Sequence, residues 1–295
     1  MTIREQFRHV LVMGGTHGNE LAGVYLIKQW RQAMSYQPKT YEVATDLANV
    51  RAIEQNRRYC AQDLNRCFSL ADLQDVRRDH YEAVRAREIA HFYTQEKPVD
   101  FIIDLHTTTT EMGATVVVST QSGFMYDLLS YLVQSQPDVR VFYEPGDLAE
   151  QPYLYTLGRY GGILVEIGQT PQGLLRADVF LKTVRLVELI LKFLDIWNEC
   201  GDLCALEMIP AFEFLEKVYC PVREGVLDAM IHPSLQGADY QPLQVGDPIF
   251  LRFTGEVICY EGVEGVCPVF VNEAAYYDTF AAFTLMKKIQ ITRGS

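Results

Sequence analysis

Short apolar runs alternate with helix-like segments along the first two-thirds of the chain. Residues 9–15 (HVLVMGG) are apolar and end in two glycines, as expected of a buried strand. In residues 19–34 the side chains Leu21, Val24 and Ile27 recur at helical spacing, which predicts a helix. Further strands are predicted at 40–49, 99–110, 113–120 and 161–168, with helices at 79–95 and 177–197. This alternation is typical of an α/β fold with a mainly parallel or mixed sheet flanked by helices.

The pattern changes from about residue 203. Residues 215–291 are rich in valine, phenylalanine, tyrosine, proline and glycine, and their short apolar runs are separated by turn residues. No helical period is present in this part of the sequence, which favours short strands. We therefore predict two domains, an α/β domain over 1–202 and a smaller, mainly β domain over 203–295.

Composition narrows the classes of function. The 295 residues are 48% apolar and carry a net charge of −12, which argues against nucleic acid and anionic membranes as partners. The most apolar long stretch, 179–197, contains five charged residues, so no transmembrane helix is expected. Seven cysteines without a C-x-x-C motif, and no signal-peptide core, predict a reduced, cytoplasmic protein. The sequence leaves open whether the chain forms a homo-oligomer.

The first candidate for chemistry is VMGGTHGNE at 12–20, where the first predicted strand ends. Its glycines match neither a dinucleotide-binding loop nor a P-loop, because no Lys-Ser or Lys-Thr follows. His17 and Glu20 are three residues apart, and imidazole and carboxylate are both zinc ligands. The alternative is a tight turn with a helix-capping residue and a surface glutamate.

A catalytic zinc needs a third protein ligand, and His106 is the best candidate among six histidines. It ends the apolar strand VDFIIDLH, at the edge where active sites of open α/β sheets gather. Asp104 lies on the same strand face and could orient a ligand or a neighbouring loop. His80 and His91 fall in a charged helix and are expected to be solvated. The alternative for His106 is a histidine satisfied locally at a strand end.

Two further parts of the sequence have charged residues at positions that need an explanation. Glu166 lies within the apolar run ILVEIG, so it needs either a buried ion pair or a role as general base. The loop RRYCAQDLNR contains Arg57, Arg58, Asn65 and Arg66, and arginine binds carboxylates through two parallel hydrogen bonds. A solvated surface charge run is the alternative for this loop.

The stretches GGTHGNELAGV, DLNR, DLHTTT, VEIGQTPQGLLRADV and PVFVNEAAYY together resemble the aspartoacylase family of zinc amidohydrolases, which are related to carboxypeptidases. The resemblance covers nearly the whole chain in order. It implies a carboxypeptidase-like zinc hydrolase domain, and a C-terminal β domain that caps the active-site channel. It also implies one Zn²⁺ per subunit, bound by His17, Glu20 and His106.

The same resemblance implies roles in catalysis and substrate binding. Arg58 would polarise the scissile carbonyl, and Asn65 and Arg66 would hold the α-carboxylate of the substrate. Glu166 would act as general base and then as general acid, and Tyr276 would reach into the substrate pocket. The implied reaction is hydrolysis of an N-acyl, mainly N-acetyl, amino acid to a carboxylate and a free amino acid.

N-acetyl-aspartate is the default substrate that the resemblance implies, but two positions depart from the aspartate-specific pattern. Phe280 stands where those members carry a lysine. In YLYTLGRYGGILVE, either Tyr155 and Arg159 supply the family's Tyr–Arg pair, or Tyr155 occupies the arginine position. These departures make an aromatic or neutral N-acyl amino acid, as in the aminoacylase-3 type, the main alternative. A zinc carboxypeptidase that cleaves peptides is the further alternative.

Overall fold

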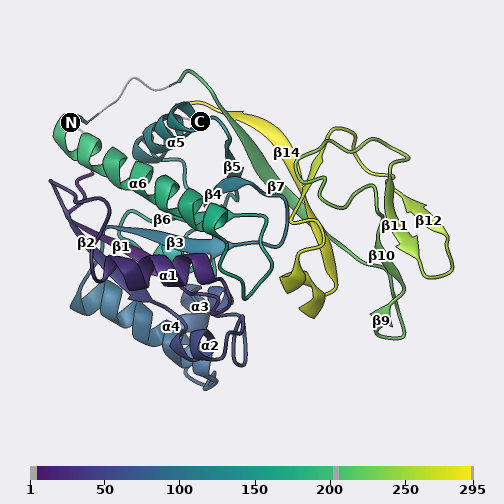
Figure 1. Cartoon of the computed structure of the whole chain (residues 1–295), viewed down its shortest axis with the longest axis horizontal. Coiled ribbons are helices and arrows are strands. Elements are labelled where there is room, and N and C mark those ends of the chain that lie inside the picture. The colour runs from purple at the N-terminus through teal and green to yellow at the C-terminus, as the bar shows by residue number, and fades with distance from the viewer. Residues whose placement is uncertain (1–4, 202–205, 294–295) are drawn as a thin grey trace.

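The computed structural model describes residues 5–201 and 206–293. Its centre is a nine-stranded sheet with the strand order β13-β14-β7-β5-β4-β6-β3-β1-β2 (Figure 1). These strands are β1 (His9–Gly14), β2 (Glu42–Leu47), β3 (Phe101–Thr107), β4 (Ala114–Val118), β5 (Val139–Tyr143), β6 (Gly162–Ile167), β7 (Ile209–Tyr219), β13 (Cys267–Val269) and β14 (Ala281–Ile291). Because β1, β2, β3 and β6 run parallel while β4 is antiparallel to β6, the sheet is mixed, and the predicted α/β fold is confirmed.

The helices flank this sheet. They are α1 (Leu21–Trp30), α2 (Val50–Glu54), α3 (Leu70–Gln74), α4 (Tyr81–His91), α5 (Gly123–Ser135) and α6 (Ala177–Cys200), with the short turns η1 (Leu64–Arg66), η2 (Phe92–Glu96), η3 (Leu154–Leu157) and η4 (Ala274–Asp278). The sequence did not predict α5 and β5. Most of α5 is buried, and its buried residues include Phe124, Leu128 and Leu132.

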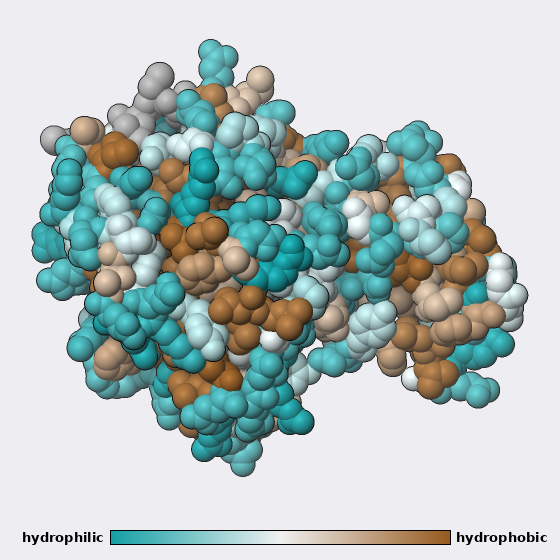
Figure 2. All heavy atoms as spheres, in the orientation of Figure 1, coloured by the Kyte–Doolittle hydropathy of each residue, from teal (hydrophilic) through white to brown (hydrophobic). Residues whose placement is uncertain are grey.

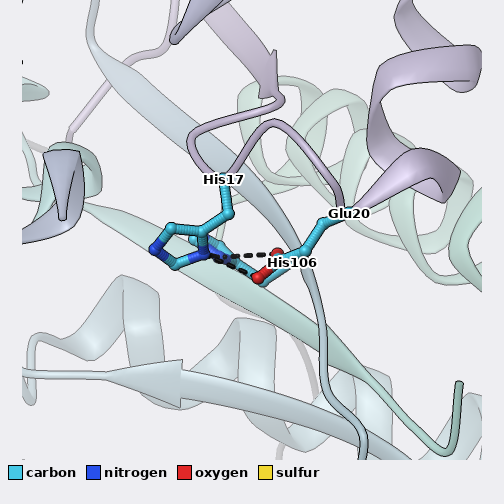
Figure 3. Close-up of side chains that lie close together, drawn as sticks. All are labelled: His17, Glu20 and His106. Atoms are coloured by element: carbon cyan, nitrogen blue, oxygen red, sulfur yellow. Dashed lines mark hydrogen bonds and ion pairs between the residues drawn. The ribbon is translucent and has the colours of Figure 1, made fainter. Parts of the chain in front are cut away.

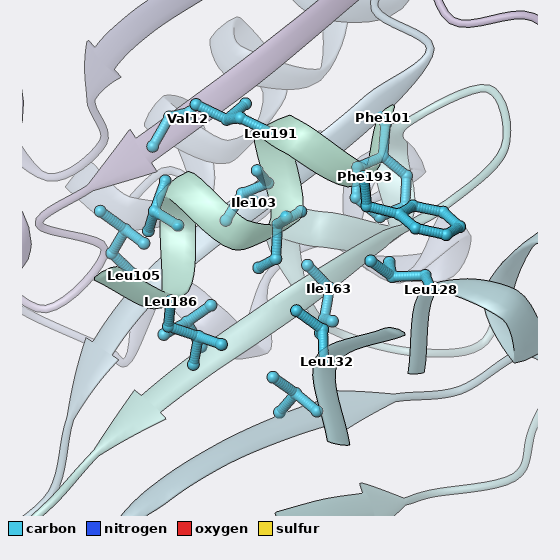
Figure 4. Packing of buried hydrophobic residues seen from close by; sticks show 14 of the residues in the cluster. Val12, Phe101, Ile103, Leu105, Leu128, Leu132, Ile163, Leu186, Leu191 and Phe193 are labelled. Atoms are coloured by element: carbon cyan, nitrogen blue, oxygen red, sulfur yellow. The ribbon is translucent and has the colours of Figure 1, made fainter. Parts of the chain in front are cut away.

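Both faces of the central sheet are buried. On β1, Val10 and Val12 face a core shared with α1, α5 and α6, and Figure 4 shows part of that core. Leu11 and Met13 point to the opposite face, into a core that includes α4 and the loop around Leu64. Side chains of a strand alternate between faces, so a strand buried on both sides is apolar at successive positions. This explains why β1 and β3 stand out as apolar runs in the sequence.

The C-terminal part shares the sheet with the preceding part and adds a core of its own. The long strands β7 and β14 pair antiparallel, and β7 continues the sheet by pairing with β5 between Phe142 and Phe212. A third core lies around Phe250 and Phe283, beside the three-stranded sheet of β10 (Ala229–Ile231), β11 (Pro248–Arg252) and β12 (Val257–Cys259) and the pair β8 (Val222–Arg223) and β9 (Val226–Leu227). The predicted boundary at 202/203 lies outside the described residues and stays a prediction.

The surface is mostly hydrophilic on the face that Figure 2 shows, and hydrophobic side chains form separate patches on it. Among the helices that the structure describes, none combines the length and apolar character needed to cross a bilayer. The six cysteines within the described ranges are free thiols. His91 is exposed as expected, but His80 is not simply solvated, because its ring accepts a hydrogen bond from the Ala83 backbone and caps α4.

Candidate functional site

His17, Glu20 and His106 converge at the edge where β1 and β3 end. β1 and β3 are parallel neighbours, so the turn after β1 lies beside the last residues of β3. Figure 3 shows the two rings and the carboxylate pointing toward one another. His17 Nδ1 lies 2.6 Å from Glu20 Oε1, and His106 Nδ1 lies 3.1 Å from both His17 Nδ1 and Glu20 Oε2. The donor atoms of all three residues lie within 4.8 Å of one another, so this cluster can bind a metal ion.

The turn that carries His17 depends on two glycines. Gly15 has a φ of +68°, a conformation that favours glycine. A Cβ atom on Gly18 would lie 2.2 Å from the carbonyl carbon of Ala52, so only glycine lets the turn approach α2 this closely. Glu20 directly precedes α1, yet its side chain does not cap the helix and is only 2% exposed. The alternative of a surface glutamate is therefore wrong.

A carboxylate contacts the far nitrogen of each histidine. Asp104 Oδ2 lies 2.9 Å from His106 Nε2, and Thr16 Oγ1 donates a hydrogen bond to the other Asp104 oxygen. Asp63 Oδ1 lies 2.9 Å from His17 Nε2. Such contacts hold the rings so that the Nδ1 atoms face the proposed metal position. The sequence analysis anticipated Asp104 as an orienting group but missed Asp63, which lies in the quoted motif DLNR.

The charges around Glu20 favour its ionised form. Burial alone would raise the pKa of Glu20, but attraction to His17 and His106 outweighs burial and lowers that pKa. The Glu20 carboxylate also accepts hydrogen bonds from the Thr107 backbone (2.9 Å) and from Arg58 Nη1 (3.2 Å). A buried carboxylate beside two imidazoles is a donor set that fits a divalent transition metal.

Glu166 lies beside the cluster because β6 pairs with β3 in a register that places it opposite His106. The side chain is buried, and Glu166 Oε1 has no hydrogen-bond partner within the described part of the chain. Burial, followed by repulsion from Glu20, raises the pKa of Glu166 well above its usual range. Glu166 forms no ion pair with any described residue, so the structural alternative of a buried ion pair is not observed.

The metal-binding cluster opens into a cavity of about 760 Å³. Its walls include all five other predicted site residues, Arg58, Asn65, Arg66, Glu166 and Tyr276, whereas Arg57 is exposed outside it. The structure thus brings every predicted site residue to one cavity. The alternative of a solvated surface charge run applies to Arg57 alone.

The arginines of this cavity differ in their partners. Arg58 Nη2 donates to Asp63 (3.0 Å), and Arg58 Nη1 donates to Glu20. Arg66 donates to the backbone oxygen of Asn65 (2.6 Å) but forms no ion pair with a described carboxylate. An arginine in a cavity without an anionic partner is suited to bind an anionic group of a ligand.

Comparisons with known proteins agree with this geometry. The family model for the succinylglutamate desuccinylase/aspartoacylase catalytic domain matches residues 6–194, and that for the AstE/AspA barrel-sandwich hybrid domain matches residues 207–288. The chain belongs to the succinylglutamate desuccinylase/aspartoacylase family. A probable aspartoacylase from Nostoc sp. is 38% identical and covers 98% of this chain and 99% of its own length. The human N-acyl-aromatic-L-amino acid amidohydrolase (carboxylate-forming) is also 38% identical, over 98% of this chain and 93% of its own.

Solved structures of the family share the fold. Murine aminoacylase 3 superposes with a TM-score of 0.91 and 37% identity, over 98% of each chain. Succinylglutamate desuccinylase from Vibrio parahaemolyticus gives a TM-score of 0.65 at 13% identity, over 97% of this chain and 83% of that one. The second likeness concerns the fold alone.

The cavity also has a wall beyond the predicted site residues. The wall contains residues that the sequence analysis did not identify, namely Phe142, Glu144, Tyr153, Phe214, Lys217, Phe270 and Glu273. Tyr155 also lines the cavity and its hydroxyl lies 2.6 Å from Ser119 Oγ, whereas Arg159 is exposed outside. Neither Arg159 nor Phe280 belongs to the cavity lining, so the segment 153–160 contributes aromatic rings there and no arginine.

The C-terminal part reaches the site through η4. Tyr276 lies in this turn, and its hydroxyl is 2.9 Å from Thr284 Oγ1 on β14. Just before the turn, the buried Glu273 accepts hydrogen bonds from the Thr108 hydroxyl and from the Thr109 backbone (2.9 Å). Thr108 follows β3 directly, so this carboxylate ties the turn that carries Tyr276 to the strand that carries His106.

Proposed function

We propose that the chain hydrolyses the amide bond of N-acyl amino acids, mainly N-acetyl amino acids, and releases a carboxylate and a free amino acid. One observation carries this proposal. A cluster able to bind a metal lines the same cavity as a buried glutamate oxygen and an arginine that have, respectively, no hydrogen-bond partner and no carboxylate partner among the described residues. The names of the relatives support the same class of reaction.

We propose one Zn²⁺ per subunit as the cation of the His17–Glu20–His106 cluster. Two imidazole nitrogens and one carboxylate form the three-ligand set of many hydrolytic zinc sites, with a position left for water. When bound, zinc would supply a water of lowered pKa and would polarise the carbonyl of the substrate. The hydrogen bonds that the two rings donate to Asp63 and Asp104 hold both imidazoles in place for this purpose.

The other residues of the cavity take complementary roles in this proposal. Glu166 accepts the proton of the attacking water and delivers it to the nitrogen of the leaving amine. Burial and repulsion from Glu20 raise the pKa of Glu166, so this carboxylate is a stronger base than an ordinary one. Arg58 faces the oxygen of the scissile carbonyl, and Asn65 and Arg66 hold the α-carboxylate. Tyr276 encloses the substrate from the C-terminal side.

The cavity wall favours aromatic or other neutral side chains. Five aromatic residues line it beside Tyr276, namely Phe142, Tyr153, Tyr155, Phe214 and Phe270. Rings of this kind bind apolar and aromatic groups through buried area and stacking. We therefore propose N-acyl aromatic amino acids as the better substrates of this site.

N-acetyl-aspartate, the default substrate in the sequence analysis, is the second candidate. Lys217 lies at the cavity wall and has no ion pair with a described residue. Its ammonium group could bind the side-chain carboxylate of this substrate. Peptide cleavage by a carboxypeptidase is less well supported, since Phe214, Lys217 and Tyr276 of the C-terminal part line the same cavity as the cluster and leave less room for a peptide. A cytoplasmic location is part of the proposal, because all described cysteines are free.

A panel of substrates tests the proposal. Purified, zinc-loaded protein is assayed for deacylation of N-acetyl-tyrosine, N-acetyl-methionine and N-acetyl-aspartate, with the chelator-treated protein as control. We expect chelator-sensitive release of free amino acid, with N-acetyl-tyrosine preferred. Absence of turnover with every member of the panel would refute the proposed function. A preference for N-acetyl-aspartate would refute only the proposed choice of side chain.

A further inference from the structure

Three consecutive residues, Tyr153 to Tyr155, support the pair Asn65 and Arg66. The Leu154 backbone N–H donates to Asn65 Oδ1 (3.0 Å), which fixes the orientation of that amide. The Arg66 guanidinium lies over the Tyr153 ring, 5.3 Å from its centroid. The rings of Tyr153 and Tyr155 are stacked, with centroids 5.7 Å apart and an interplanar angle of 8°. We call these three residues the 153–155 platform.

Both tyrosines of the platform are anchored through their hydroxyl groups. Tyr153 donates to the two carboxylate oxygens of Glu144, at 3.0 and 2.9 Å. The Tyr155 hydroxyl lies 2.6 Å from Ser119 Oγ. Glu144 directly follows β5 and Ser119 directly follows β4, so both anchors lie at the ends of strands in the central sheet. These hydrogen bonds therefore fix the platform to the central sheet.

Arg66 needs such support because its side chain is long and forms no ion pair with any carboxylate in the described part of the chain. Its polar contact is with the backbone oxygen of Asn65, and its other support is the Tyr153 ring. Fixing a flexible arginine before the ligand arrives reduces the entropy lost on binding. A cation stacked on an aromatic ring is also stabilised electrostatically.

We infer that the 153–155 platform positions Asn65 and Arg66 to bind the α-carboxylate of the substrate, with Tyr153 as the positioning residue and Glu144 as its anchor. This inference rests on the proposed function. It gives the segment a role different from the one expected of the aspartate-specific pattern. The segment supports the carboxylate-binding pair and does not supply a cation to the side-chain pocket.

A double-mutant cycle tests the inference with N-acetyl-tyrosine as substrate. Tyr153→Leu removes the ring, and we expect KM to rise roughly 3- to 30-fold, the range of one cation–π contact, with a smaller change in kcat. Tyr153→Phe keeps the ring and loses only the bond to Glu144, so its effect is smaller. Arg66→Lys keeps the charge but loses the planar group. In that background we expect Tyr153→Leu to change KM less than about twofold.

Phe214→Leu is the matched control, because Phe214 lines the same cavity but has no cation–π contact with Arg66. Its effect on KM should be independent of Arg66→Lys, so the fold-changes of the two single variants should multiply in the double variant. If the fold-changes in KM caused by Tyr153→Leu and Arg66→Lys also multiply, Tyr153 has only a packing role and the inference is overturned. Thermal unfolding of each variant shows that the fold is kept.

The same cycle, measured as Kd for N-acetyl-tyrosine by calorimetry, separates the inference from the proposed function. Coupled binding without turnover would refute the function and leave the inference standing. Turnover without coupling would refute the inference alone. Failure to bind N-acetyl-tyrosine at all would refute both.

Discussion

Replacing Glu166 by glutamine removes the proposed proton acceptor and keeps the shape of the side chain. Glu166 is 8% exposed, and one of its oxygens has no hydrogen-bond partner among the residues described. Glutamine fits the same space but cannot accept a proton from water at neutral pH. The metal-binding residues are unchanged, so the variant separates metal binding from proton transfer.

Loss of a general base lowers rates by roughly 10²–10⁴-fold, which corresponds to about 3–5 kcal/mol at the barrier. We expect kcat of Glu166→Gln to fall within that range. The free energy of unfolding of the metal-free Glu166→Gln protein should instead increase. A carboxyl group whose pKa is raised by folding contributes stability at low pH, and that stability is lost as pH rises through the folded-state pKa. At pH 8 the metal-free glutamine variant avoids this loss and should be more stable than the parent.

The assay combines turnover of N-acetyl-tyrosine, zinc content by elemental analysis and urea unfolding of the metal-free protein. Glu82→Gln is the matched control for stability. Glu82 is fully buried, but its carboxylate accepts hydrogen bonds from the backbone of Cys60 (2.6 Å) and of Ala61 (3.1 Å), which help to lower its pKa against the effect of burial. That substitution should therefore reduce stability. Near-normal turnover of Glu166→Gln with full zinc content would refute its role as base.

Four other substitutions test separate parts of the site and the fold. His17→Ala and His106→Ala should each lose bound zinc by elemental analysis, and stoichiometric zinc in both would refute the ligand set. Burial raises the pKa of Asp239 to about 6, so this group costs up to about 3 kcal/mol of stability as pH rises from 4 to 7. Asp239→Asn should remove that part of the fall in the free energy of unfolding, which urea unfolding measures at each pH. An unchanged pH dependence would contradict this account. Lys217→Met should lower kcat/KM about 10- to 150-fold for N-acetyl-aspartate and hardly at all for N-acetyl-tyrosine, as expected for one charge-assisted contact. Lys288→Met on β14 is the control, and equal losses for both substrates would contradict a role of Lys217 in selectivity.

Much of the central sheet could be predicted from the sequence because its strands are buried on both faces. β1, β3 and β6 appear as continuous apolar runs. The helices α1 and α6 have a solvent-exposed face, so their apolar residues recur at helical spacing. The helix α5 was missed, although its contrast between apolar and polar positions is no weaker than that of α1. The continuation of the sheet into β7 was also missed, because pairing with β5 depends on contacts about 70 residues apart in the sequence.

Part of the candidate site could likewise be predicted from the sequence, and part of it could not. Residue type and local position were enough to single out His17, Glu20 and His106, since few side chains bind metals and these lie at strand ends. The carboxylate of Asp63 behind His17 could not be assigned, because it is one of 38 acidic residues and its contact with His17 is made only by the fold.

The sequence by itself therefore determined β1 to β4 and β6 of the central sheet, the metal-binding residue types and the charged residues that needed partners. These properties depend on local periodicity and on the chemistry of single side chains. Only the tertiary structure decided that Tyr155 lines the cavity while Arg159 faces solvent, and that Lys217 and Glu144 share one wall. Such outcomes depend on strand register and on packing between distant segments, and spacing along the chain does not encode them.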